Sequence, residues 1–119
     1  MIRILTDSDL GVPQIPECLI VEWVERGHRV VFSYARQGNA ITAHFAAAKD
    51  SLREVKTAIN DFVEWALWAY PWCEMVFANA GRASIGRLVT KCGFGFLTEA
   101  EGFKVYVKYR ELPHDRLVA

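Results

Sequence analysis

Apolar side chains recur at helical spacing over residues 51–69, the most regular segment of the chain. Ser51 and Glu54 stand three residues apart at its start, which is the pattern of a capping box. The expected buried stripe consists of Leu52, Val55, Ile59, Phe62, Val63, Ala66 and Leu67. Because Pro71 disfavours helical geometry in the residue before it, the pattern predicts a helix that ends near Ala69.

A strand pair is predicted before this helix. β-Branched and aromatic side chains dominate residues 28–36, and the apolar pattern resumes over residues 40–47. The segment Gln37-Gly38-Asn39 between them predicts a tight reversal, so the two runs should form a hairpin. In the second strand one face carries Ile41, Ala43, Phe45 and Ala47, and the other carries Thr42, His44, Ala46 and Ala48.

The amino-terminal segment predicts a short strand over residues 2–5 and then a helix. Pro16 and Glu17 suit a helix start, and the apolar run 18–26 ends at Gly27, a residue that often follows a helix end. A helix that is apolar on most faces should be largely covered by a sheet or a partner.

The carboxy-terminal half alternates strands with one more helix. The predicted elements are a strand at 74–78, a helix at 82–91 ended by Cys92-Gly93, and strands at 94–98 and 103–109. Lys104, Lys108 and Arg110 share one face of the last strand, which indicates a solvated edge.

The predicted order is therefore β α β β α β α β β. This order is typical of an α/β (α+β) fold with a mixed central sheet, parallel in the middle and antiparallel at the ends, and helices on both faces. No linker or repeat interrupts the chain, so residues 1–119 are expected to form a single domain. The tail 111–119 is polar at first and carries Pro113, so it should be peripheral.

Composition narrows the function classes. Fourteen basic and fourteen acidic side chains give a formal net charge of +0, so no bulk charge draws the protein to nucleic acid or a membrane. The amino terminus lacks a secretory apolar run and no later run is long enough to span a bilayer, which predicts a cytoplasmic protein. Cys18, Cys73 and Cys92 lie far apart without clustered histidines, so we expect no metal site and no disulfide framework.

One stretch of the sequence carries a family resemblance. The segment CEMVFANAGRASIGRLVTKCGFGFLTEAEGFKVYVKYR resembles the second half of GNAT-type N-acetyltransferases, in which a helix ends in Gly-Phe before two closing strands. The pair here is Gly93-Phe94, preceded by Leu88 and Lys91 at the spacing of that family. The opening IRILTDSDL is also similar to the first strand of the family. The resemblance covers about half of the chain and implies an acyl-CoA-dependent enzyme.

The sequence departs from the family pattern at two functional positions. The family binds the coenzyme A pyrophosphate at a glycine-containing loop before the long helix, whereas residues 47–53 here contain no glycine. Many members protonate the leaving thiolate with a tyrosine, and the matching residue here is Val89.

The resemblance implies a set of site residues. His44 is the first candidate for a general base, with Glu22 as the other, and Tyr106 is a candidate acid. The resemblance places Phe45, Ala46 and Ala47 along the pantetheine arm of acetyl-CoA, Lys49 and Arg53 near its phosphates, and Asn79 at the entry of the second helix.

Two functions follow. The first is a divergent N-acetyltransferase that moves an acetyl group from acetyl-CoA to an unidentified amine. The second is a catalytically inactive GNAT-like protein that serves as a binding subunit, similar to phage-encoded GNAT-like proteins of the virion or head assembly, where it would reside within a virion. Trp65, Trp68 and Trp72 crowd the end of the long helix, and they indicate either core packing or contact with a protein partner or a second copy.

Overall fold

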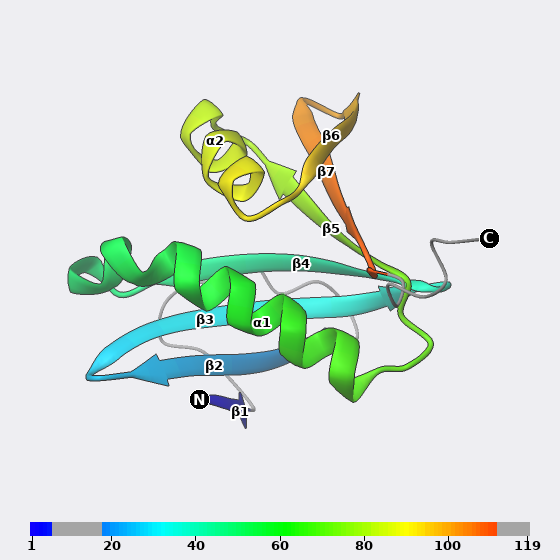
Figure 1. Cartoon of the computed structure of the whole chain (residues 1–119). Coiled ribbons are helices and arrows are strands. Elements are labelled where there is room, and N and C mark those ends of the chain that lie inside the picture. Colours follow the sequence, from blue (N-terminus) through cyan, green and yellow to red (C-terminus); the bar gives the residue numbers. More distant parts are fainter. Residues whose placement is uncertain (6–17, 112–119) are drawn as a thin grey trace.

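The structure is a computed structural model that describes residues 1–5 and 18–111. Its main feature is a seven-stranded sheet in the order β1-β2-β3-β4-β5-β7-β6 (Figure 1). The strands are β1 Ile2–Leu5, β2 Leu19–Glu25, β3 His28–Gln37, β4 Ala40–Ala47, β5 Met75–Ala80, β6 Gly95–Ala100 and β7 Phe103–Tyr109. A 3₁₀ turn, η1 (Lys49–Glu54), leads into α1 (Val55–Ala69), and α2 (Ala83–Lys91) follows β5.

The mixed α+β fold predicted from the sequence is confirmed. Within the described residues β4 and β5 pair in parallel, and the other neighbouring strands are antiparallel. The hairpin of β3 and β4, the end of α1 at Ala69, and α2 with its two following strands lie where the sequence predicts them. The helix start expected at Pro16 and Glu17 and the tail from residue 112 lie outside the described residues.

The helix predicted over residues 18–26 is wrong, because this segment is strand β2. Ile20, Val21, Glu22 and Trp23 are all buried, so the strand is covered on both faces and shows none of the alternation that marks a half-buried strand. Gly27 has a positive φ of 81°, as expected of a residue after a helix, but it shares a two-residue hairpin turn with Arg26 at φ 50°.

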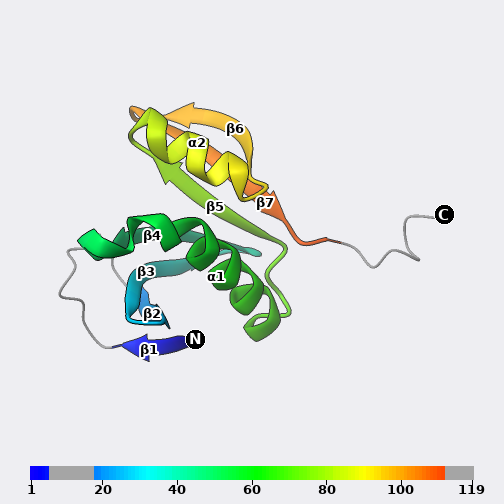
Figure 2. The ribbon, with the colours of Figure 1, turned by 60° about the vertical axis from the view of Figure 1, so that its left-hand side comes forward.

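Both described helices lie on the same face of the sheet, which corrects the expectation of helices on both faces. Helix α1 lies over the β1–β4 half, α2 lies beside it over the β5–β7 half, and the two helices contact each other (Figures 1 and 2). Phe32 of β3 stacks on Phe62 of α1 with ring centroids 4.3 Å apart, and this pair sits in the middle of the core.

The charged row on β7 faces the helices, so the prediction of a solvated edge is wrong for its last two members. Lys108 donates to the Cys92 carbonyl at the end of α2, at 2.8 Å. Arg110 donates to the carbonyls of Leu67 (2.7 Å), Tyr70 (3.1 Å) and Cys73 (2.8 Å). These two side chains therefore fasten the carboxyl ends of both helices to the sheet.

The strand assignment of residues 19–25 makes a prediction at Gly27. Gly27→Ala should lower the free energy of unfolding by about 1–2 kcal/mol, because a Cβ disfavours a positive φ. No atom lies within 4 Å of the Cβ that would be added, so the loss comes from the backbone alone. Urea denaturation of the variant measures it.

Gly95→Ala is the matched control. Gly95 has the same free space around it and is absent from the residues with positive φ, so its replacement should leave stability nearly unchanged. Equal stability of the two variants would contradict the turn between β2 and β3.

Candidate functional site

The parallel strands β4 and β5 pair at one end only. Ala40 to Ala43 pair with Met75 to Ala78, and beyond this point the two strands diverge. Figure 1 shows β5 leaving β4 at an angle. Residues 44–47 of β4 are paired with β3 on one side but not with β5 on the other. Their backbone groups on that side are open to a ligand in extended conformation.

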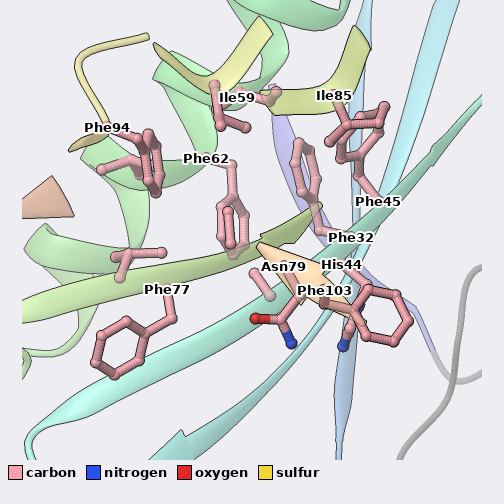
Figure 3. A pocket seen from close by; sticks show the side chains of 15 residues that line it. Phe32, His44, Phe45, Ile59, Phe62, Phe77, Asn79, Ile85, Phe94 and Phe103 are labelled. Carbon is pink, nitrogen blue, oxygen red and sulfur yellow. The ribbon is translucent and has the colours of Figure 1, made fainter. Parts of the chain in front are cut away.

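A cavity of about 260 Å³ lies at this divergence. It is lined by Phe32, Ala43, His44, Phe45, Ile59, Phe62, Val63, Val76, Phe77, Ala78, Asn79, Ile85, Val89, Phe94 and Phe103. Side chains alternate along each strand, so the lining comes from both faces of the sheet. Figure 3 shows Phe45, Phe62 and Phe94 on the helix side, and His44 and Asn79 at the opposite end beside Phe103.

Solved structures with a similar fold carry acetyltransferase names. An acetyltransferase of Bacillus subtilis in complex with CoA aligns with a TM-score of 0.65 at 12% identity, over 92% of this chain and 98% of that chain. A chimera of the spermidine N-acetyltransferase SpeG from Vibrio cholerae and hSSAT aligns with a TM-score of 0.62 at 10% identity, over 77% of this chain and 66% of that chain.

The fold of the described residues is similar to that of these two acetyltransferases. At these identities the likeness concerns the fold, and the match spans just under two thirds of the chimera. Neither a protein-family model nor a curated protein sequence matches the chain. Of the predicted site residues, His44, Phe45 and Asn79 line the cavity at the divergence of β4 and β5.

His44 is the titratable side chain of the cavity. It is half-buried on β4, and burial lowers its pKa from the usual value near 6.5, because burial disfavours the charged imidazolium. The ring is therefore neutral at physiological pH and able to accept a proton. Asn79 of β5 lies at the same end of the cavity (Figure 3).

The other predicted cofactor-binding residues follow the path from the cavity to the start of α1. Phe45 and Ala47 point to the helix side, because they pair with the core residues Phe32 and Val30, and Ala46 points to the other face with Val31. Lys49 lies in η1, and the side chain of Arg53 is exposed.

The capping box predicted from Ser51 and Glu54 does not form. Neither η1 nor α1 has a side-chain cap, and the buried Ser51 hydroxyl instead accepts the backbone N–H of Arg29 on β3 at 3.0 Å. The Ala48 N–H donates to the Arg29 carbonyl at 3.1 Å. These two bonds fix the turn before α1 to the start of β3. Leu52 was expected in the buried stripe of the helix. It lies in the 3₁₀ turn η1, before α1 begins, and is 67% exposed.

Two candidate residues lie away from the cavity. Tyr106 sits in a second hollow between α2 and β7, with its hydroxyl 2.5 Å from the position a Cβ on Gly86 would take. Glu22 is buried on the other half of the sheet, where Arg3 and Arg29 each donate to it at 2.8 and 2.7 Å. Burial raises the pKa of Glu22, but the hydrogen bonds and charges of both arginines outweigh it and lower the pKa overall.

Several lining residues were missed by the sequence reasoning. Phe77 and Asn79 are two residues apart on β5, so their side chains share a face. Strand periodicity could therefore have identified Phe77 once Asn79 was a candidate. Phe103 comes from a different hairpin, and no sequence signal brings it near His44. Val89 is buried in the cavity wall, where it has no proton to donate.

The tryptophan cluster is divided by the fold. Trp68 is 79% exposed, whereas Trp65 is half-buried against Tyr34 and Tyr70. The Arg36 guanidinium lies 3.8 Å above the ring of Trp72. Core packing thus holds for Trp65 and not for Trp68, and contact with a partner stays a prediction.

The remaining features concern membrane-spanning helices and metal-binding groups of side chains. Among the described residues, no helix is long and apolar enough to cross a membrane. The same residues contain no group of three or more His, Cys, Asp and Glu side chains placed to hold a metal ion.

The His44 environment predicts a pH dependence of stability. Because the pKa of His44 is lowered in the folded state and stays near 6.5 in the unfolded chain, its contribution is complete above pH 6.5. That contribution should be lost as the pH falls through the lower folded pKa. An NMR titration of the imidazole should give a midpoint below the midpoint in urea.

His44→Gln assigns the resonance and serves as the control. Its unfolding free energy should depend less on pH below 6.5 than that of the parent protein. A folded-state midpoint at or above the unfolded value would show that burial does not govern this histidine.

Proposed function

We propose that the protein is an acyl-CoA-dependent N-acyltransferase that acts on an amine. The observation that carries this proposal is the divergence of β4 and β5 over a cavity with one titratable side chain. When bound, acyl-CoA supplies an acyl group activated as a thioester. The CoA complex of the Bacillus subtilis acetyltransferase supports CoA as the ligand for this fold.

The residues present fit the pantetheine arm. Residues 44–47 of β4 have no β5 partner, so their backbone N–H and C=O groups are able to pair with the amides of an extended ligand. The side chains along this path are Phe45, Ala46 and Ala47. They are all apolar, and none is β-branched.

The residues at the start of η1 fit the phosphates in part. The first hydrogen bond of the turn runs from the Ser51 N–H to the Ala48 carbonyl, at 2.8 Å. The N–H groups of Lys49 and Asp50 precede this bond, so the turn itself offers them no acceptor. An anion would be able to accept hydrogen bonds from them. The exposed Arg53 follows within the same turn and adds a positive charge. The Asp50 carboxylate opposes this charge, which predicts modest affinity.

His44 is the proposed general base. A neutral imidazole at the polar end of the cavity would accept the proton that an amine loses as it attacks the acyl carbon, and the C–S bond would break to release CoA as a thiolate that takes its proton from water. Asn79, at the same end, would orient the amine through its amide. Acetyl-CoA is the simplest donor for such a site.

A second candidate is a non-catalytic protein that binds acyl-CoA or a protein partner. The observation that favours it is Val89, a buried valine where many GNAT enzymes have a proton donor. This protein would keep the cavity and the open edge of β4 but would not turn over an acyl donor.

Calorimetric titration with CoA tests binding, and Arg53→Glu tests the phosphate assignment. CoA should bind at micromolar concentration, and Arg53→Glu should weaken it about ten-fold, because one attraction becomes a repulsion. Pantetheine lacks the nucleotide phosphates, so its affinity should not change.

Lys91→Glu is the control for net charge. Lys91 is exposed in the last turn of α2, away from η1, and its reversal should alter neither affinity. Absence of CoA binding at millimolar concentration would remove both candidate functions that involve CoA.

Turnover of acetyl-CoA with a panel of primary amines separates the two candidates. His44→Ala should reduce turnover at least about 100-fold through loss of the base, while CoA affinity changes much less. Thiol release measured with a chromogenic disulfide reports the rate. Binding without turnover in the parent protein would favour the non-catalytic candidate.

A further inference from the structure

We propose that the cavity selects an acyl group longer than acetyl, so that the preferred donor is a short- to medium-chain acyl-CoA. This inference rests on the proposed function and names its donor class. It follows from how polarity, side-chain size and space are distributed along the cavity.

The cavity has one apolar end and one polar end. His44 and Asn79 are the lining side chains with polar atoms, and both lie on the sheet face away from the helices. The helix-side lining is hydrocarbon throughout: Phe32, Phe45, Ile59, Phe62, Ile85 and Phe94 are its large members. The two ends therefore suit two different parts of a reaction.

The amine belongs at the polar end. An amine in water is largely protonated, and burying its charge among aromatic and aliphatic side chains would be costly without a partner. His44 and Asn79 offer the hydrogen-bonding groups that an amine needs as it loses a proton. The helix side is then left to the acyl group, which has no polar atom beyond its carbonyl.

Small side chains open the way to the helix side. Ala43 and Ala78 form the last paired row of β4 and β5, and both face the helices. Two rows earlier, on the same face, the paired residues are Ile41 and Val76, which are almost fully buried. The change from branched residues to alanines at the point of divergence leaves space directly beneath α1 and α2.

The walls of this space are held by packing. Phe62 stacks on Phe32 at 4.3 Å, and Phe32 contacts Phe45 at 6.3 Å between ring centroids. Val89 and Phe94 are 2% and 4% exposed, so the α2 side is also closed to water. A preformed apolar wall favours a chain that fills it, because no large rearrangement opposes binding.

The cavity volume is of the order that a short acyl chain needs. A cavity of about 260 Å³ has room for on the order of eight groups of water size, at about 30 Å³ each. The thioester and the adjoining end of pantetheine use part of this volume. An acyl chain of roughly four to six carbons would fill the remainder.

Calorimetric titration with CoA, acetyl-CoA, butyryl-CoA and hexanoyl-CoA tests the inference. Each buried methylene should tighten binding about four-fold, so butyryl-CoA should bind at least about ten-fold more tightly than acetyl-CoA. If CoA binds but the acyl series shows equal affinity, or acetyl-CoA binds most tightly, the inference is overturned and the proposed function stands. If CoA itself does not bind, both fail.

Ala78→Leu tests the location of the chain. The added side chain would occupy the space beneath the helices, so the ratio of hexanoyl-CoA to acetyl-CoA affinity should fall at least five-fold. Ala100→Leu is the matched control, because Ala100 is exposed on β6 and absent from the cavity lining, and the ratio should not change. An unchanged ratio in a folded Ala78→Leu variant would show that the chain binds elsewhere and would overturn the inference. If the Ala78→Leu variant does not fold, the affinities of the parent protein for the acyl-CoA series still test the preference for a longer acyl group.

Discussion

The parallel pairing of β4 and β5 is the constraint on which the rest of the structure depends. At one end the strands are tied together, since the Glu74 N–H donates to the Asn39 carbonyl and the Arg110 N–H donates to the Glu74 carbonyl, each at 2.8 Å. The Arg110 guanidinium adds bonds to three carbonyls around the end of α1. With this end closed and the other end free of cross-strand bonds, the divergence has a fixed position, and the cavity forms there.

Packing on the helix side keeps the divergence from closing. The stacked Phe32 and Phe62 fill the centre of the core beside the first half of the sheet, while Val89 and Phe94 fill the second half. Lys108 ties the end of α2 to β7. Each half of the sheet thus carries its own helix, and the boundary between the halves coincides with the gap between β4 and β5.

The sequence departs from the resembled family at two places that the structure describes. In the turn before α1, the Ser51 hydroxyl and the Ala48 N–H are both bonded to Arg29 of β3, so two polar groups of the turn are already used. Where a tyrosine would donate a proton, Val89 adds to an apolar wall. The helix side of the cavity therefore has no polar side chain at this point, and His44 and Asn79 remain as the polar groups of the opposite end.

The sequence by itself determined the elements whose signals are local. The apolar period and Pro71 defined α1, Gly38 and Asn39 defined the β3–β4 reversal, and Gly93, with φ 91°, defined the end of α2. His44 and Asn79 were also found from the sequence, through their strand positions and a family resemblance.

Only the tertiary structure decided the features that depend on neighbours distant in the chain. The run 19–25 is a strand that pairs with β1 and β3 along its two edges and is buried on both faces, and a continuous apolar run does not distinguish that case from a buried helix. Ser51 bonds to β3 instead of capping its own helix, because Arg29 lies beside it in the fold. Tyr106 is separated from His44 because it lies in the cross-strand row of Ala43 and Ala78 on the helix face, whereas strand order brings Phe103 to the cavity end of His44. Periodicity tells which side chains share a face, but the pairing of distant strands decides what that face meets.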